Sequence, residues 1–526
     1  MIPSKNNGID PAVGRHDASI AFMSFSLATT GRDRFRWNVQ RLFAAALLAG
    51  VVPVYGQSSL EYDFTNFVGT AGSTGSSNGF GTTAQFSNPW GVAVDTNGNS
   101  YVADQWNSII RKVTPAGQVT TLVGTAAKLW RPSGVAVGPD GNLYITDTLN
   151  NTIKQVTPAG GVTVVAGSNN TFKHGTNDGA GPLALFSNPF GLVVDNAGNI
   201  FVTDTGNHTI RRISLVGSTW MVTTIAGDIT QTNSSGGIIA GSTDGTNTVA
   251  RFKSPYGVAV DSAGNLFVSD TGNNTIRKIT PVGTNWVTTT LAGSVGMSGS
   301  ANGTNTAARF NGAWGLVVDS AGNLFVADGG NSQIREVTPM GTNWVVTTIG
   351  GGSWYGSTNG IGTAARFYQP AGIAVDATGT LFVADTSNNR ISKGVPCTPF
   401  QAWQLQYFGC TTCPNAAADA DPLGKGMSNW NQFLAGLNPT NPASVFGVTS
   451  LKQSGSNLVI TWKTAGRSTN VVQAANGILS DGLSNSFSDI SGPILISVAG
   501  DTTTNYSVLG GATNGPARFY RIRLGP

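Results

Sequence analysis

The sequence predicts an all-β protein: a propeller of six four-stranded blades, closed by an N-terminal strand and followed by a small C-terminal β-sandwich. Three observations support this. The chain has 70 glycines among 526 residues and only 11% charged residues, far from the usual quarter and consistent with many tight turns. A unit of similar sequence recurs six times between Pro89 and Pro396. A strand-like stretch, residues 62–72, stands without a hairpin partner before the first unit.

Residues 1–56 are predicted to be a leader with a secretory signal peptide. Four arginines precede the apolar run 42–56, which is too short for an ordinary membrane-spanning helix but suits a signal sequence. Val54 and Gly56 offer small residues for cleavage before Gln57, and a start at Met23 would make residues 1–22 an extension. The alternative is a membrane anchor that is never cleaved. We expect a secreted, periplasmic or cell-surface protein with no later membrane span.

The charge of the chain gives no sign of nucleic-acid binding. The leader holds six basic and three acidic residues, which is +3 of the total of +4. The remaining chain is therefore close to neutral. A nearly neutral protein lacks the basic surface that nucleic acid requires.

Each repeat, within residues 57–396, is predicted to form one propeller blade. In "GVAVDSAGNLFVSDTGNNTIRKITPVGTNWVTTTLAG" we expect a short buried strand, a glycine turn, and three further strands. Periods of this length with an all-β pattern indicate a propeller or a solenoid. The sixth repeat stops at "RISKGVP" without a fourth strand, whereas "FTNFVG" near residue 64 matches the fourth-strand pattern "VTTLVG". We therefore expect the N-terminal strand to complete the sixth blade and leave no open sheet edge.

The pattern "P-x-G-(V/L)-x-V-D-x-x-G-N-(L/I)-(F/Y)-V-x-D-x-x-N-x-x-I-(R/K)" resembles that of NHL-repeat propellers, and "NGIGTAARF" with "TTIGG" is similar to the teneurin-type subgroup of exported proteins. The resemblance implies the fold. It does not imply one activity, because a propeller hosts many functions.

Two acidic positions recur nine residues apart, and a basic position follows them. A catalytic pair would be unique to one blade, so we interpret the carboxylates as turn-forming acceptors and the cations as their partners. The acidic pairs are Asp95 and Asp104, Asp195 and Asp204, Asp261 and Asp270, Asp319 and Asp328, and Asp376 and Asp385; Asp147 stands alone in the second repeat. The cations are Arg111, Lys154, Arg211, Arg277 and Arg335, with Ser392 in the sixth repeat. The repeated Phe86, Phe186, Phe252, Phe310 and Phe367 are expected to lie between blades.

The candidate binding site is a ring of aromatic residues at the mouth of the central channel. The residue before the first-strand glycine is, in order, Trp90, Ser133, Phe190, Tyr256, Trp314 and Ala371. Four aromatic side chains there could stack on a sugar or a peptide side chain; alternatively, they pack against neighbouring blades. The long, dissimilar loops 168–185, 228–251 and 353–366 should lie on the same face, where rigid scaffolds usually carry function.

We expect no catalytic residues. After the leader the chain has only two glutamates, Glu61 and Glu336, and only two histidines, His174 and His208. These are too few to favour a histidine zinc site or a Ser-His-Asp triad. The main alternative is a calcium-dependent propeller hydrolase or lyase of the lactonase kind, built on Asp and Asn oxygens. A purely structural envelope component is a third. No cofactor is expected, apart from Ca²⁺ under that alternative.

Residues 397–444 are predicted to be a connector containing all three cysteines. In an exported protein Cys410 and Cys413 could form a disulfide and leave Cys397 unpaired; a zinc site lacks a fourth ligand. The stretch "DADPLGKGMSNWNQFLAGLNPT" resembles short calcium-binding segments, with Asp419, Asp421 and Asn429 retained. However, Leu423, Lys425 and Gln432 occupy ligand places, so we expect no metal.

Residues 445–526 are predicted to form an immunoglobulin- or fibronectin-like sandwich. Its expected strands are 457–464, 470–476, 496–500, 505–511 and 518–524. Together these features predict a monomeric, non-enzymatic binding or scaffold module. Its partner would be a protein or a glycan.

Overall fold

A computed structural model describes residues 61–423 except 169–172, 235, 353, 410 and 412, and beyond them Asn429, Gln432, residues 439–440 and the strands between 447 and 525. Leu60–Thr398 forms one compact unit, and the chain from Pro399 belongs to a second. The predicted leader lies outside the described residues. Among the described residues, no helix combines the length and the apolar character needed to cross a membrane.

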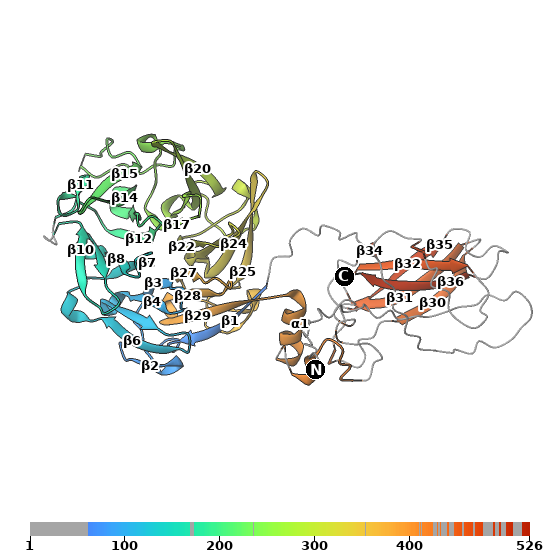
Figure 1. Cartoon of the computed structure of the whole chain (residues 1–526). Coiled ribbons are helices and arrows are strands. Elements are labelled where there is room, and N and C mark those ends of the chain that lie inside the picture. The colour runs from blue at the N-terminus through green and yellow to red at the C-terminus, as the bar shows by residue number, and fades with distance from the viewer. Residues whose placement is uncertain are drawn as a thin grey trace, which may run out of the picture. The chain divides into compact units, whose positions relative to one another are not determined.

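The first unit contains six antiparallel sheets, which we call blades one to six (Figure 1). Blade one contains β2 (Gly79–Phe80), β3 (Pro89–Val94), β4 (Ser100–Asp104), β5 (Ile109–Val113) and β6 (Gln118–Val123). Blade two contains β7 (Pro132–Val137), β8 (Leu143–Asp147), β9 (Thr152–Val156) and β10 (Val162–Ala166). Blade three contains β11 (Gly179–Ala180), β12 (Pro189–Val194), β13 (Ile200–Asp204), β14 (Thr209–Val216) and β15 (Thr219–Ala226).

The remaining three blades repeat this order. Blade four contains β16 (Gly245–Thr246), β17 (Pro255–Val260), β18 (Leu266–Asp270), β19 (Thr275–Val282) and β20 (Asn285–Gly293). Blade five contains β21 (Gly303–Thr304), β22 (Ala313–Val318), β23 (Leu324–Asp328), β24 (Gln333–Met340) and β25 (Asn343–Gly350). Blade six contains β26 (Gly360–Ile361), β27 (Pro370–Val375), β28 (Leu381–Asp385), β29 (Arg390–Cys397) and β1 (Glu61–Val68).

The first long strand of each blade is innermost. Around the ring β3, β7, β12, β17, β22 and β27 each contact the next, and β27 contacts β3. The predicted six-bladed propeller is thereby confirmed.

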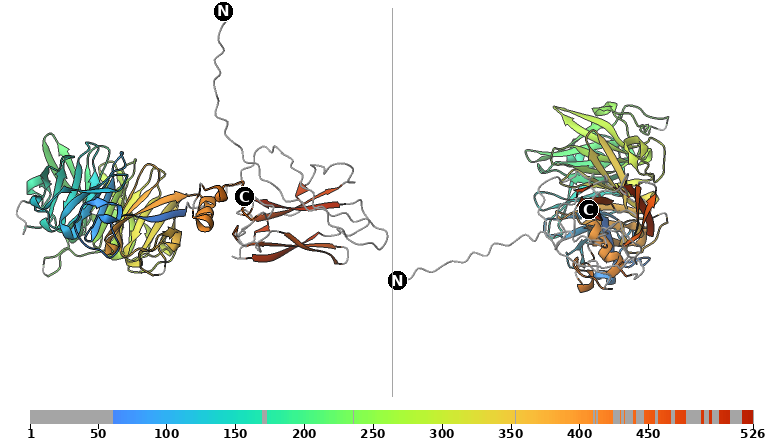
Figure 2. Two further views of the ribbon diagram at one scale, coloured as in Figure 1. Left: turned by 90° about the horizontal axis from the view of Figure 1, so that it is seen from below. Right: turned by 90° about the vertical axis from the view of Figure 1, so that its right-hand side faces the viewer.

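The N-terminal strand closes this ring, as predicted. Strand β1 pairs antiparallel with β29, with Tyr62 opposite Pro396 and Thr65 opposite Lys393; in Figure 2 the blue first strand lies among the orange strands of the last blade. Phe64 is buried and meets Phe367 edge to face, with ring centroids 5.1 Å apart. Gly394 leaves the room for it, because a Cβ there would lie 2.4 Å from the Phe64 ring.

Five blades carry a fifth, two-residue strand that the sequence analysis missed. These strands, β2, β11, β16, β21 and β26, pair with the outermost long strand of their own blade. Blade two lacks one, since only residues 124–131 connect β6 to β7. One-turn 3₁₀ helices precede five of the innermost strands (Gly81–Thr83, Gly181–Leu183, Asn247–Val249, Asn305–Ala307 and Gly362–Ala364), and Thr125–Ala127 precedes that of blade two.

The hydrophobic core lies between adjacent blades. Phe86 is fully buried in a cluster with Val68 and Phe382 of blade six and Val102 of its own blade. The equivalent side chains are buried in the same way at the other long-loop junctions: Phe186, Phe252, Phe310 and Phe367. Their predicted position between blades is confirmed.

The second unit begins with a helix that the sequence analysis did not predict, α1 (Pro399–Phe408), followed by a 3₁₀ turn at Pro414–Ala416. The described residues that follow include seven strands: β30 (Gly447–Ser454), β31 (Asn457–Ala465), β32 (Thr469–Asn476), β33 (Ser488–Asp489), β34 (Ile494–Leu495), β35 (Asp501–Val508) and β36 (Arg518–Gly525). They form two antiparallel sheets, β30-β31-β35 and β33-β32-β34 with β36 on β32. The predicted strand 496–500 lies outside the described residues, and the sandwich packing stays a prediction.

Candidate functional site

The first repeated aspartate holds the turn between the two inner strands. Asp95 Oδ1 accepts hydrogen bonds from the backbone N–H groups of Asn97 and Asn99 at 2.9 and 2.8 Å, and Oδ2 accepts from the Asn99 amide and the Tyr101 hydroxyl. Asp195, Asp261, Asp319 and Asp376 bind the same turn backbone in their blades. In blade two Asp140 binds the Asn142 backbone instead. The turn-forming interpretation is confirmed.

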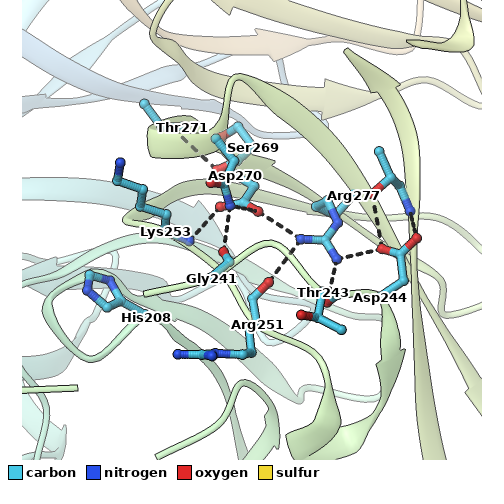
Figure 3. A network of polar contacts seen from close by, with 12 residues as sticks. His208, Gly241, Thr243, Asp244, Arg251, Lys253, Ser269, Asp270, Thr271 and Arg277 are labelled. Atoms are coloured by element: carbon cyan, nitrogen blue, oxygen red, sulfur yellow. Dashed lines mark hydrogen bonds and ion pairs between the residues drawn. The ribbon is translucent and has the colours of Figure 1, made fainter. Parts of the chain in front are cut away.

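The second aspartate and the repeated arginine form a buried clamp, shown for blade four in Figure 3. Asp270 accepts hydrogen bonds from the Lys253 backbone N–H, the Asn273 amide and Arg277 Nη1, each at 2.8 Å. Arg277 is fully buried, and its Nη2 reaches the exposed Asp244 carboxylate at 2.6 Å. Its guanidinium also donates to the Thr243 and Arg251 carbonyl oxygens, both at 3.0 Å.

The clamp therefore fastens the long loop before the innermost strand to the body of its blade. Arg111, Arg211 and Arg335 repeat it with Asp104, Asp204 and Asp328. These carboxylates and guanidinium groups are engaged with one another. This is the pairing of carboxylate and cation expected from the sequence.

Two blades vary the clamp. In blade two Lys154 Nζ contacts Asp147 at 2.5 Å. The loop before this blade is short, so the lysine only has to pair with the aspartate and needs no planar guanidinium to bind a long loop as well. In blade six Ser392 occupies the arginine position, but Arg390 replaces it from two residues earlier, with Nε 2.8 Å from Asp385. The role of Arg390 was not predicted from the sequence; the available signal was an arginine at a position where the other units have Thr, Ile or Gln.

The aromatic residues predicted at the channel mouth gather across the propeller axis. The Trp90 ring lies 5.6 Å from Phe190, 6.4 Å from Tyr256 and 5.2 Å from Trp314, and the Phe190 and Tyr256 rings are 4.5 Å apart. All four side chains are half-buried. Trp90 and Tyr256 belong to opposite blades, and Phe190 and Tyr256 belong to neighbouring ones.

These rings and the innermost strands line a cavity of about 90 Å³. Ligand pockets usually enclose roughly 300–1,000 Å³, so the channel itself has room for a few water molecules and not for a sugar ring. Ser133 and Ala371, the non-aromatic members of the position, are buried in its wall. A ligand of the mouth would therefore lie on top of the aromatic cluster.

The Trp314 ring packs against Gly329, a glycine that the other blades do not have at this position. A Cβ at Gly329 would lie 2.3 Å from the Trp314 ring. Blades two, three, four and six carry threonine at this position, and its hydroxyl donates to the first carbonyl of the next innermost strand (Thr148, Thr205, Thr271 and Thr386). Gly329 in blade five cannot make this hydrogen bond, but it leaves space for the Trp314 indole at the channel mouth.

The loops before the innermost strands open on the same face as these rings, since Trp90, Phe190, Tyr256 and Trp314 each stand second in an innermost strand. Exposed Trp106, Trp130, Trp354 and Tyr355 also belong to the loops of this face. They were not predicted from the sequence because most of the equivalent positions in the other repeats hold a residue that is not aromatic.

The few histidines and glutamates after the predicted leader do not form a common cluster in the described part of the chain. His208 accepts a hydrogen bond from the Ser254 backbone N–H at 3.1 Å, where other blades use Asn or Ser, and burial lowers its pKa. Among the described residues there is no group of three His, Cys, Asp or Glu side chains that could hold a metal ion. In the connector Asn429 donates to the Asn415 and Ala417 carbonyls.

Among the described residues, Glu336 is the one buried carboxylate that has no salt bridge to a cation. It stands opposite Phe325 on the neighbouring strand, where other blades place Lys112 over Tyr101 and Lys278 over Phe267. Burial, with the negative charge of Asp319 second, raises the pKa of Glu336 to about 7. Because the folded-state pKa lies above the unfolded one, Glu336 favours folding at low pH, and this contribution is lost as the pH rises through about 7.

The Glu336→Gln variant is expected to lose less stability than the parent protein between pH 6 and pH 8, because its amide cannot ionise. The extra loss in the parent protein should be about 1 kcal/mol, since only the unit between pH 6 and the pKa of about 7 contributes and each pKa unit corresponds to about 1.4 kcal/mol. Urea unfolding at both pH values measures the difference. Equal pH dependence in the two proteins would contradict the assignment.

The structure describes two of the three cysteines, and one of them, Cys397, is unpaired as predicted. Cys397 is free and buried, and burial raises the pKa of its thiol to about 11. Cys413 is disulfide-bonded. Cys410 lies outside the described residues, so its pairing with Cys413 stays a prediction.

Comparison with known proteins identifies the repeat. Five segments match the NHL repeat: residues 129–156, 186–213, 252–279, 310–336 and 367–393. Protein SUPPRESSOR OF QUENCHING 1 of Arabidopsis thaliana is 39% identical over 112 residues, 21% of this chain and 10% of that protein. NHL repeat-containing protein 2 of Bos taurus is 31% identical over 172 residues, 32% of this chain and 22% of that protein.

Among solved structures, a protein of unknown function from Bacteroides thetaiotaomicron superimposes with a TM-score of 0.50 at 19% identity, covering 64% of this chain and 76% of that one. This likeness concerns the fold alone. The five matched segments fall in blades two to six, and blade one completes the ring. The chain therefore carries five NHL repeats, and residues 61–397 form a six-bladed β-propeller.

Proposed function

We propose that this protein is an exported, non-enzymatic binding module that captures a protein or a glycan on the face around the channel mouth. The observation that carries the proposal is the cluster of Trp90, Phe190, Tyr256 and Trp314 at the start of the innermost strands. Half-buried aromatic rings held in place and surrounded by loops are typical of binding hot spots.

The chemistry of the rest of the propeller supports binding rather than turnover. Its recurring carboxylates are committed to turns and clamps, and the described residues offer no cluster for a metal. Export is supported by the leader in the sequence and by the disulfide at Cys413, because disulfides persist in oxidising compartments. The C-terminal strands would then serve as a spacer or an anchor.

Replacing Trp90 and Trp314 together by alanine is expected to abolish capture of the ligand while the propeller stays folded. The purified protein would first be applied to a glycan and peptide array, and the variant would then be tested against each selective hit by calorimetry. Met340→Ala, an exposed change at a hairpin on the opposite face, is the matched control and should bind like the parent. Thermal unfolding would check the fold of both variants.

Undiminished capture by the double variant would refute the channel mouth as the site. Stoichiometric metal together with turnover that a chelator removes would favour the calcium-dependent hydrolase or lyase. A protein with neither a hit nor a metal would be a structural component.

A further inference from the structure

A second cavity lies away from the channel, between blades five and six. Its volume is about 410 Å³, and it is lined by Asn302, Gln333, Thr348, Gly351, Gly352, Thr363 and Arg366. This volume lies within the range of small-molecule sites. None of these residues lines the channel cavity.

The lining is polar throughout and carries a single charge. The five residues that are not glycine offer amide, hydroxyl or guanidinium groups, and Arg366 is the only ionisable one. A pocket without aliphatic side chains does not suit an apolar ligand. One guanidinium without a carboxylate in the lining favours a single negative charge, and a planar fork matches a carboxylate.

Arg366 is held so that part of its fork stays free. Nη1 donates to the Thr363 and Ala365 carbonyl oxygens, and the guanidinium lies against Gly352, where a Cβ would clash with Nη1 at 2.4 Å. In the described part of the chain, Nη2 and Nε of Arg366 make no hydrogen bond. These two donors are left for a ligand.

Gln333 supplies an acceptor in the same cavity. Its Oε1 is buried and has no hydrogen-bond partner among the described residues. A buried polar atom of this kind costs about 1–3 kcal/mol unless a partner satisfies it. A hydroxyl group of a ligand would donate to this oxygen. Thr363 offers a further hydroxyl, and Thr348, whose hydroxyl donates to Asn302 Oδ1 at 3.0 Å, can accept a hydrogen bond.

We propose that this cavity binds a sugar acid, a hydroxylated ring with one carboxylate, whose carboxylate pairs with Arg366 and whose hydroxyls bind Gln333 and the threonines. The loop that provides Gly351 and Gly352 continues into Trp354 and Tyr355, whose side chains are 78% and 66% exposed. Neither ring belongs to the cavity lining, and the Tyr355 ring stacks on Tyr368 with ring centroids 4.6 Å apart, so the proposal rests on the polar lining.

The test is calorimetric titration of the full chain with glucuronate and galacturonate. We expect saturable binding of at least one of them, weakened at least tenfold by Arg366→Ala and weakened by high salt. Glucose and galactose, which lack the carboxylate, should bind at least tenfold more weakly. Inorganic phosphate and acetate should not compete at equal concentration.

Arg309→Ala is the matched control. Arg309 occupies the same place one blade earlier, and its Nη1 also donates to two loop carbonyls, those of Thr306 and Ala308. This variant should bind like the parent, which separates the loss of a ligand contact from the loss of a loop contact. Gln333→Leu should weaken binding with unchanged salt dependence.

The proposal is overturned if neither sugar acid binds, if Arg366→Ala binds as tightly as the parent, or if the neutral sugars bind equally well. Competition by phosphate would assign the site to simple anions and would equally overturn it. The Trp90→Ala, Trp314→Ala double variant should retain sugar-acid binding. A failure at one site is therefore distinguishable from a failure at the other.

Discussion

A chain without residues 61–68 is expected not to form a closed ring. Blade six would then lack its outer long strand and expose the edge of β29, and the buried space between Gly350 and Gly394 would lose the Phe64 ring. Val68 would also be missing from the cluster around Phe86, at the junction with blade one. We expect aggregation, or a collapsed state without a cooperative unfolding transition, because exposed strand edges associate.

A synthetic peptide of residues 57–70, added in trans, should restore the ring, since it carries the complete pairing partner of β29. Protection of β29 amides from hydrogen exchange measures closure. The same peptide with Phe64→Ala should rescue poorly, because removing a buried phenylalanine costs about 3–5 kcal/mol. A peptide with Thr65→Ala, an exposed position, should rescue like the parent. Cooperative folding of the truncated chain without any peptide would show that the strand is dispensable.

Arg277→Leu is expected to lower the free energy of unfolding by about 3–5 kcal/mol, the usual effect of breaking one side of a buried ion pair. Asp270 would remain buried without its cation, and Asp244 and the Thr243 carbonyl would lose the group that ties the long loop to blade four. Denaturant unfolding measures the loss, and proteolysis within residues 228–251 should report the released loop.

Arg277→Lys is the informative control, because blade two already uses Lys154 in this place. Lysine can keep the contact with Asp270 but cannot also reach Asp244, so we expect a smaller loss, on the order of 1–2 kcal/mol. Increased cleavage of the loop should nevertheless persist. If Arg277→Leu unfolds like the parent, the clamp does not stabilise the blade.

The sequence predicts the propeller well because each blade repeats one pattern of buried positions and turns. The unpaired stretch around Phe64 could be placed in blade six, since only one repeat lacked a fourth strand. The turn role of Asp95 and the pairing of Arg111 with Asp104 followed from recurrence alone, and the structure confirms both.

What escaped prediction depends on contacts between repeats or on positions that do not recur. Arg390 reaches Asp385 from two residues before the expected place, and only the geometry of the strand shows that its side chain can do so. The contacts of Trp90 with opposite blades depend on the width of the channel, which no single repeat specifies. The cavity at Arg366 joins residues of two blades, and helix α1 lies outside the repeats altogether.

The pairing of Glu61 with Cys397 joins residues 336 positions apart. At ribosomal rates of 5–20 residues per second, the interval between making the two residues is roughly half a minute. Throughout that time the earliest-made strand of the propeller has no partner, and the ring stays open. Closure therefore marks the completion of the whole domain, because any product that ends before blade six leaves β1 without its partner strand.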